Sequence, residues 1–167
     1  MTRKQYVLCF AQQVPYRTLP EVILIERLNE PHAGKLNLPG GKIHDGEIPE
    51  AAAVRELHEE TGLWASSADT KVLGTIEGET WQVHVCYCPY RSTPALGPSQ
   101  EARTQAPDEG QVLTLSIREA LDDPKLIPNL QVIIPLCIAK ATGWRMQDTH
   151  DGVIVQLNSV LAFSNAA

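Results

Sequence analysis

GKIHDGEIPEAAAVRELHEETGL, residues 41–63, is the most strongly patterned stretch of this 167-residue chain. Pro49 suits the first turn of a helix, where its missing N–H is harmless. Alanines and other good helix formers follow Pro49, and Gly62 supplies a stop at the C-terminal end. We therefore expect a helix that begins at Pro49 and ends at Thr61.

Three glutamates share one face of this expected helix. Glu56, Glu59 and Glu60 are spaced i, i+3 and i+4, so their side chains lie on the same side. Like charges at that spacing repel one another and destabilise a helix. A divalent cation such as Mg²⁺ reverses the sign of this effect, because it prefers oxygen ligands. The pattern predicts a metal site, to which Glu47 can add a fourth carboxylate.

Two neighbouring glycines lie before the helix. Gly40 and Gly41 have no Cβ, so their backbone can approach a metal ion or a phosphate closely. The plainer interpretation of the whole stretch is a solvated acidic helix with an ordinary glycine cap.

The same stretch resembles the Nudix box, which is Gly, five residues, Glu, seven residues, and then Arg-Glu-aliphatic-any-Glu-Glu-any-Gly-aliphatic. With average residue usage, a chance match in a chain this long has odds of about one in ten million. Those odds disfavour the plainer interpretation. Every fixed position matches: Gly41, Glu47, Arg55, Glu56, Leu57, Glu59, Glu60, Gly62 and Leu63.

Length and composition indicate one globular domain over residues 1–167. Hydrophobic residues make up 43% of the chain and the net charge is −6. An acidic balance argues against binding to a nucleic-acid polymer, which needs a basic surface. We see no signal peptide or membrane span, and expect a cytoplasmic protein with buried, reduced thiols. The four cysteines are Cys9, Cys86, Cys88 and Cys137.

The remaining pattern mixes strands and helices, which fits an α/β fold with a mixed sheet between helices. The resemblance implies the same arrangement, a Nudix-type α/β/α sandwich. We expect a long loop over 91–110 and a C-terminal extension over 143–167, to which we assign no role. The expected strands are 4–12, 21–27, 36–38, 71–78, 80–90, 111–117, 143–146 and 153–157, and the other helices are 118–122 and 129–141.

The resemblance implies roles for the box residues in Mg²⁺ binding, with Mn²⁺ able to substitute. Glu59 and Glu60 would be the principal ligands, and Glu56 and the Gly40 carbonyl would complete the coordination sphere with waters. Arg55 is adjacent and cationic, so it can hold a carboxylate in place and ionised.

The general base is expected to be Glu56 or Glu109. Glu109 precedes a strand, where similar proteins often place an additional functional glutamate. Glu101 and Asp108 compete with Glu109 for that role, and a solvated loop acid is the alternative.

Further residues are expected to contact a substrate. Arg27 and Lys42 would reach phosphates, as Gly41 would by close approach, and a surface salt bridge is the alternative for Arg27. Asn37 and Asn129 resemble residues that read a nucleotide base through paired hydrogen bonds. Asn129 also begins the late helix, where it is a good N-cap.

The resemblance implies hydrolysis of a nucleoside diphosphate linked to another group, and three function classes compete. Foremost is a (d)NTP pyrophosphohydrolase that releases the monophosphate and pyrophosphate, as in house-cleaning of the nucleotide pool. Second is an enzyme for ADP-ribose, another nucleotide sugar, a dinucleoside polyphosphate or coenzyme A. Residues 76–81 lack the proline and the tyrosine typical of the ADP-ribose and dinucleoside polyphosphate enzymes.

The third class is a non-catalytic domain that binds a nucleotide or a partner. Such domains commonly lose box glutamates, and this chain has all of them. The expected partner is therefore a small nucleotide, and neither a nucleic-acid polymer nor a membrane. The sequence leaves open the base, the sugar and the formation of a homodimer.

Overall fold

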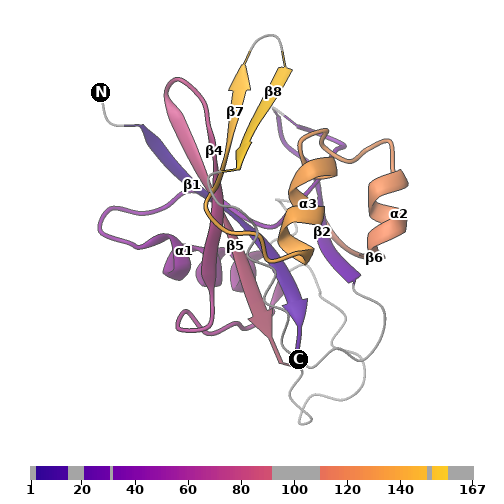
Figure 1. The fold of residues 1–167 in the computed structure, drawn as a ribbon. Helices are drawn as coiled ribbons and strands as arrows, with labels where there is room; N and C mark the ends of the chain where they lie inside the picture. The colour runs from indigo at the N-terminus through magenta and orange to yellow at the C-terminus, as the bar shows by residue number, and fades with distance from the viewer. Residues whose placement is uncertain (1–2, 15–20, 31, 92–109, 150–151, 158–167) are drawn as a thin grey trace, which may run out of the picture.

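The computed structural model describes residues 3–14, 21–30, 32–91, 110–149 and 152–157 of the chain (Figure 1). The box helix begins at Pro49 and ends at Thr61, as expected. In chain order the elements are β1 Lys4–Gln13, β2 Glu21–Arg27, β3 Leu36–Asn37, α1 Pro49–Thr61, β4 Lys71–Glu77, β5 Trp81–Tyr90, β6 Gly110–Ser116, α2 Ile117–Asp122, α3 Leu130–Ile138, β7 Trp144–Thr149 and β8 Gly152–Leu157.

The described strands form two sheets. One has the order β1-β5-β4-β7-β8, and the other has the order β3-β2-β6. The larger sheet is mixed, because β1 runs parallel to β5 and β4 parallel to β7, whereas β4 is antiparallel to β5. The expected final hairpin is confirmed, since β7 and β8 pair antiparallel.

Helices cover both faces of the larger sheet. Side chains on successive strand residues point to opposite faces. Cys9 and Cys86 therefore pack with Leu57 of α1 on one face, whereas Tyr87 packs with Ile133 of α3 on the other. Figure 1 shows the sheet lying between α1 and α3. The expected α/β/α sandwich is confirmed.

Burial holds α1 in place against the sheet. The side chain of Leu57 is fully buried, and burial of a leucine contributes about 1.5–3 kcal/mol.

The four cysteines are buried and free, as expected. Among the described helices, none combines the length and the apolar character needed to cross a bilayer.

Helix α3 differs from its expected bounds at both ends. Asn129 precedes it with φ −65° and ψ −24°, and its side chain makes no capping hydrogen bond. The expected side-chain cap is therefore wrong, because a capping residue normally has extended backbone angles. The helix ends at Ile138 rather than continuing to Ala141, because Lys140 adopts a left-handed backbone with φ 51°.

The contact between β4 and β7 requires a glycine. Gly74 pairs with Trp144 across these strands. A Cβ added to Gly74 would collide with the indole ring of Trp144, which is 1% exposed. The absence of a side chain at Gly74 thus lets the largest buried side chain of the core lie against the sheet.

Replacing Gly74 by alanine should therefore be costly. Overpacking a full core costs about 1–3 kcal/mol, and we expect a loss of at least about 2 kcal/mol in the free energy of unfolding, measured with urea. Gly34→Ala is the control, because φ is 73° there and nothing lies within 4 Å of the added Cβ. That variant should lose only the backbone cost, about 1 kcal/mol. Equal losses in both variants would show that the Trp144 ring yields without cost.

Candidate active site

Strand β1 fixes the segment that leads into the box helix. The Val7 N–H donates to the carbonyl of Gly41 at 2.9 Å, and the Cys9 N–H donates to the carbonyl of Pro39 at 2.7 Å. These bonds use the carbonyls on either side of Gly40 and not the Gly40 carbonyl itself. The expected metal-ligating carbonyl is thus held by its neighbours without being used in the pairing with β1.

Both glycines of this segment are needed where they stand. The backbone of Gly40 has φ 155°, and a Cβ there would collide with the backbone of Val7. A Cβ on Gly41 would come within 2.5 Å of the Glu56 carboxylate. The space that a side chain at Gly41 would fill is therefore taken by a glutamate of α1.

Two carboxylates of α1 meet this glycine pair. The Gly40 N–H donates to Oε2 of Glu60 at 2.8 Å, and the Glu56 carboxylate lies against Gly41. The exposed fractions of Glu60 and Glu56 are only 5% and 9%. Buried carboxylates are costly unless they are hydrogen-bonded or paired with a cation. The structure thus places two of the predicted metal ligands against the backbone of Gly40 and Gly41, which we expected to approach a metal ion or a phosphate.

Arg55 connects the carboxylates of the box. Its Nη1 donates to Glu56 at 2.8 Å and to Glu59 at 3.1 Å. Its Nε and Nη2 donate to the two oxygens of Glu47 at 3.0 and 2.9 Å. Nη2 also donates to the Lys42 carbonyl at 3.0 Å. The guanidinium therefore joins the loop before α1 to the acidic face of the helix.

These contacts shift the pKa values of both partners. The pKa of the Glu47 carboxyl is lowered, chiefly by its hydrogen bonds with Arg55 and secondarily by the His44 N–H. The pKa of Arg55 is raised, chiefly by the same bonds with Glu47. Glu47 was expected as a fourth carboxylate at the metal, and here its two oxygens are bound to Arg55 instead.

The donor set of the site suits a hard divalent cation. Glu56, Glu59 and Glu60 offer only oxygen atoms, which Mg²⁺ and Mn²⁺ prefer. In the described part of the chain no three acidic, histidine or cysteine side chains already surround one point. Glu59 is the most open of the three, with 56% of its side chain exposed, and both Glu59 and Glu56 bind Arg55. These carboxylates fit the ion chemically, and the Arg55 guanidinium holds two of them in place.

Two of the predicted substrate residues lie together on the smaller sheet. Ile25 of β2 pairs with Asn37 of β3, and Arg27 is two residues further along β2. Because side chains alternate along a strand, Arg27 and Asn37 lie on the same face. The Oδ1 atom of Asn37 accepts a hydrogen bond from the Leu38 N–H at 2.9 Å.

Asn129 is brought to the same strand by backbone contacts. The Leu36 N–H donates to the Lys125 carbonyl, and the Ile127 N–H donates to the Leu36 carbonyl. Asn129 follows two residues later. Its buried Oδ1 has no hydrogen-bond partner in the described part of the chain, and neither has the buried Nε of Arg27.

The remaining predicted site residues are Lys42 and Glu109. Lys42 is exposed. Its main-chain carbonyl is part of the site, because it accepts a hydrogen bond from Arg55. Sequence reasoning missed this role, because a main-chain acceptor leaves no signal in the sequence. Glu109 lies outside the described residues, and so do its competitors Glu101 and Asp108.

A family model described as the NUDIX domain matches residues 6–130. The chain belongs to the Nudix family. Because the match covers most of the chain, the box and the surrounding sandwich are features of a Nudix domain.

Curated relatives resemble this Nudix chain over a short stretch. The 8-oxo-dGTP diphosphatase of Escherichia coli is 52% identical over 44 residues, which is 26% of this chain and 34% of that protein. The ADP-ribose pyrophosphatase of Methanocaldococcus jannaschii is 51% identical over 43 residues, or 26% of this chain and 25% of that protein. The chain thus spans about a third or less of the length of these relatives.

Solved structures share the fold over a much larger part of the chain. The mutator MutT protein of Bacillus halodurans has a TM-score of 0.61 at 16% identity, covering 92% of this chain and 97% of that one. A Nudix hydrolase from Clostridium perfringens has a TM-score of 0.60 at 18% identity, covering 83% and 98%. At these identities the likeness shows the Nudix fold.

The Arg55–Glu47 contact makes stability depend on pH. The pKa of Glu47 is below its ordinary value of 4.5 in the folded protein, so its contribution is present above about pH 4.5 and is lost as the pH falls through the lower, folded value. Glu47→Gln keeps the shape but removes the charge. At pH 7 we expect it to lower the free energy of unfolding by about 1–2 kcal/mol, and this deficit should shrink towards pH 3.

Urea denaturation at several pH values between 7 and 3 measures this deficit. Glu30→Gln, at an exposed acid, is the control and should match the wild type throughout. A deficit for Glu47→Gln that is the same at pH 3 as at pH 7 would contradict a charge-based role.

Proposed function

We propose that this Nudix chain hydrolyses a nucleoside diphosphate linked to another group in a reaction that requires Mg²⁺. The foremost substrate is a nucleoside triphosphate, ribose or deoxyribose, with the monophosphate and pyrophosphate as products. The observation that carries the proposal is the buried Glu56–Glu60 pair, which meets the Gly40–Gly41 backbone within a complete box.

Each box residue has a distinct part in this proposal. Glu59, Glu60 and Glu56 would hold the ion with the Gly40 carbonyl. Arg55 hydrogen-bonds Glu56 and Glu59, and so keeps these like charges together before the ion binds. A bound divalent cation supplies positive charge to the phosphate oxygens and acidity to the attacking water. In this proposal the carboxylates of the helix face are already close together before the ion binds, and Arg55 compensates part of their negative charge.

The proton of the attacking water would be accepted by Glu56 or Glu109. Glu56 is buried against Gly41 and bound to Arg55, so its position is fixed. Comparing Glu56→Gln with Glu109→Gln tests the assignment, because the loss of the base should lower kcat more than KM.

Substrate contact is proposed for the polar residues around β3. Within the described residues, the Nε of Arg27 is an unused donor suited to a phosphate, and the Oδ1 of Asn129 is an unused acceptor suited to the edge of a base. Unpaired buried polar atoms are costly, and a ligand that pairs with them gains affinity and specificity. The E. coli relative named 8-oxo-dGTP diphosphatase supports this class.

The second candidate is hydrolysis of ADP-ribose or of an ADP-sugar. It is favoured by relatives with those names, including the ADP-sugar pyrophosphatase of Mus musculus, 55% identical over 49 residues, or 29% of this chain and 22% of that protein. The matched stretches are short and span only part of each relative. A non-catalytic role is the third candidate, and the complete set of box glutamates argues against it.

Removing a charged ligand should abolish most of the activity. Glu59→Gln and Glu60→Gln each keep the shape of the side chain, and the amide oxygen introduced by Glu60→Gln can still accept from the Gly40 N–H. We expect each to lower kcat/KM by at least about a hundredfold, the scale of several kcal/mol of lost transition-state stabilisation. We also expect millimolar Mg²⁺ to raise the melting temperature of the wild type, and each variant to weaken that rise.

Glu50→Gln, in the first turn of the same helix, is the matched control and should remain active. Activity within a few-fold of the wild type in both the Glu59 and the Glu60 variants would remove the metal assignment.

Nucleoside triphosphates should be better substrates than ADP-ribose or dinucleoside polyphosphates. A panel of nucleotides with Mg²⁺, scored for pyrophosphate against phosphate release, measures this preference. Asn129→Ala should lower kcat/KM about tenfold for the preferred base, with a smaller change for poor ones. Because Asn129 does not cap α3 in the structure, this variant should melt as the wild type does.

Asn129→Asp keeps an acceptor oxygen and removes the amide donor. It therefore separates acceptance of a hydrogen bond from donation as the basis of the base preference. Faster cleavage of ADP-ribose than of every triphosphate would replace the first candidate with the second.

A further inference from the structure

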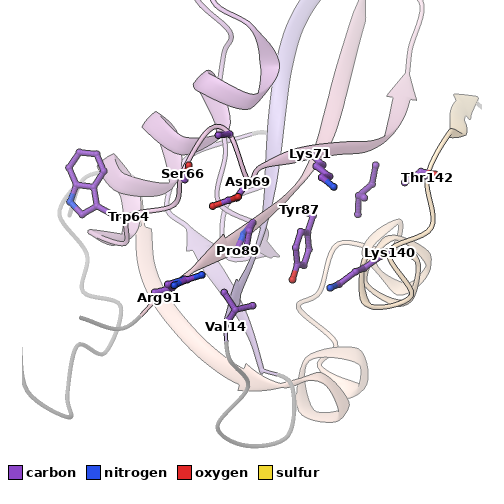
Figure 2. A pocket seen from close by; sticks show the side chains of 12 residues that line it. Val14, Trp64, Ser66, Asp69, Lys71, Tyr87, Pro89, Arg91, Lys140 and Thr142 are labelled. Carbon is purple, nitrogen blue, oxygen red and sulfur yellow. The ribbon is translucent and has the colours of Figure 1, made fainter. Parts of the chain in front are cut away.

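A cavity of about 800 Å³ is lined by no residue of the box itself, although Trp64, which follows the box, is part of its wall. It lies between the first residues of β4, the last residues of β5, the segments that follow α1 and α3, and the residue that follows β1 (Figure 2). None of the residues that line it is among those expected to bind the metal or the substrate. Its volume is within the range that suits small organic ligands.

Positive charge is concentrated in this cavity although the chain is acidic. The whole chain has 14 lysines and arginines against 20 aspartates and glutamates. The cavity is lined by Lys71, Arg91 and Lys140, and by one acid, Asp69. Lys71 begins β4, Arg91 follows β5 and Lys140 follows α3, so three separate elements bring cations to one space.

These three cations are not used in ion pairs within the described part of the chain. Cations gathered from different elements repel one another. That repulsion is relieved by an anion that contacts all of them. The cavity therefore favours an anionic ligand.

Lys140 reaches the cavity through an unfavourable backbone conformation. Its φ is 51°, and it is the only residue other than glycine with a positive φ in the described ranges. Its N–H donates to the Cys137 carbonyl, and the Ala141 N–H donates to the Leu136 carbonyl. This is the Schellman ending of a helix, in which glycine is the least strained residue at the Lys140 position.

The strained position places the charge of Lys140 at the cavity. Its Nζ lies 4.9 Å from the centre of the Tyr87 ring, which also lines the cavity. Figure 2 shows the Lys140 side chain directed towards Tyr87. This conformation ends α3, and its occurrence at the wall of a cationic cavity supports the hypothesis that Lys140 has a binding role.

We propose that this cavity binds a phosphate monoester with an apolar or aromatic body, such as a nucleoside monophosphate. The phosphate is held by the positive charge of Lys71, Arg91 and Lys140, whose exposed side chains are free to turn towards it, since a guanidinium and ammonium groups match a doubly charged phosphate. The body of the ligand lies against Pro89 and Val14, which line the same space. This site is separate from the one proposed for hydrolysis.

Lys140→Gly provides a sharp test because it should not damage the fold. Glycine relieves the strain at φ 51° while removing the charge. We expect the melting temperature to stay the same or rise, and binding of AMP to weaken at least about tenfold, a factor of ten in Kd. Lys71→Gln should weaken binding similarly, and Lys4→Gln, at an exposed lysine outside the cavity, should not.

Binding is measured by titration calorimetry with AMP in EDTA, so that no turnover or metal is involved. Adenosine should not bind, and added salt should weaken the binding of AMP. Arg27→Ala removes the phosphate contact proposed at the hydrolysis site and should leave this binding intact. The hydrolysis rate of Lys140→Gly should stay within about twofold of the wild type.

Four results would overturn the proposal. They are no binding of AMP by the wild type, unchanged binding by Lys140→Gly, binding lost only in Arg27→Ala, and inorganic phosphate binding as tightly as AMP. The third result would place AMP in the site proposed for hydrolysis. The second would leave Lys140 with only its contact to the Tyr87 ring. Because the binding of AMP is measured in EDTA, without turnover, a failure of the proposed hydrolysis does not alter the binding test.

Discussion

The charge balance around Arg55 is the interaction on which the box depends. Glu56, Glu59 and Glu60 crowd one face of α1, and Glu47 approaches from the preceding loop. The guanidinium binds three of these four carboxylates and the backbone of Lys42, so it neutralises repulsion and closes the loop at once. Without that cation, the buried carboxylate of Glu56 would lose its ion pair in a poorly hydrated space, whereas Glu60 would keep its bond from the Gly40 N–H.

Much of the fold could be predicted because its signals are local. Pro49 and Gly62 bound the box helix, and its bounds are as expected. The division of strands into two sheets could not be predicted, because it depends on pairings between distant segments such as β1 with β5. The expected cap at Asn129 is wrong because residue type alone does not determine the backbone angles that a cap requires.

The candidate site also has some features that could be predicted from the sequence and others that could not. The carboxylates of α1 could be placed on one face from their spacing, and the structure brings Glu56 and Glu60 to the predicted glycines. The partnership of Glu47 with Arg55 was not predicted, because it depends on how the loop folds back over the helix. The cationic cavity was also not predicted, because Lys71, Arg91 and Lys140 are far apart in the chain and line one cavity only once the sheet and α3 have packed together.

The buried thiols have a consequence for chemical durability. A thiolate reacts with oxidants far faster than a thiol does. Burial raises the pKa of Cys137 to about 12 and also raises that of Cys86, while hydrogen bonding to Cys88 and burial raise that of Cys9. Cys9 and Cys86 lie under α1, in the layer that supports the acidic face. The raised pKa values of Cys9 and Cys86 thus favour the protonated, less reactive form of the thiols that pack beneath the site.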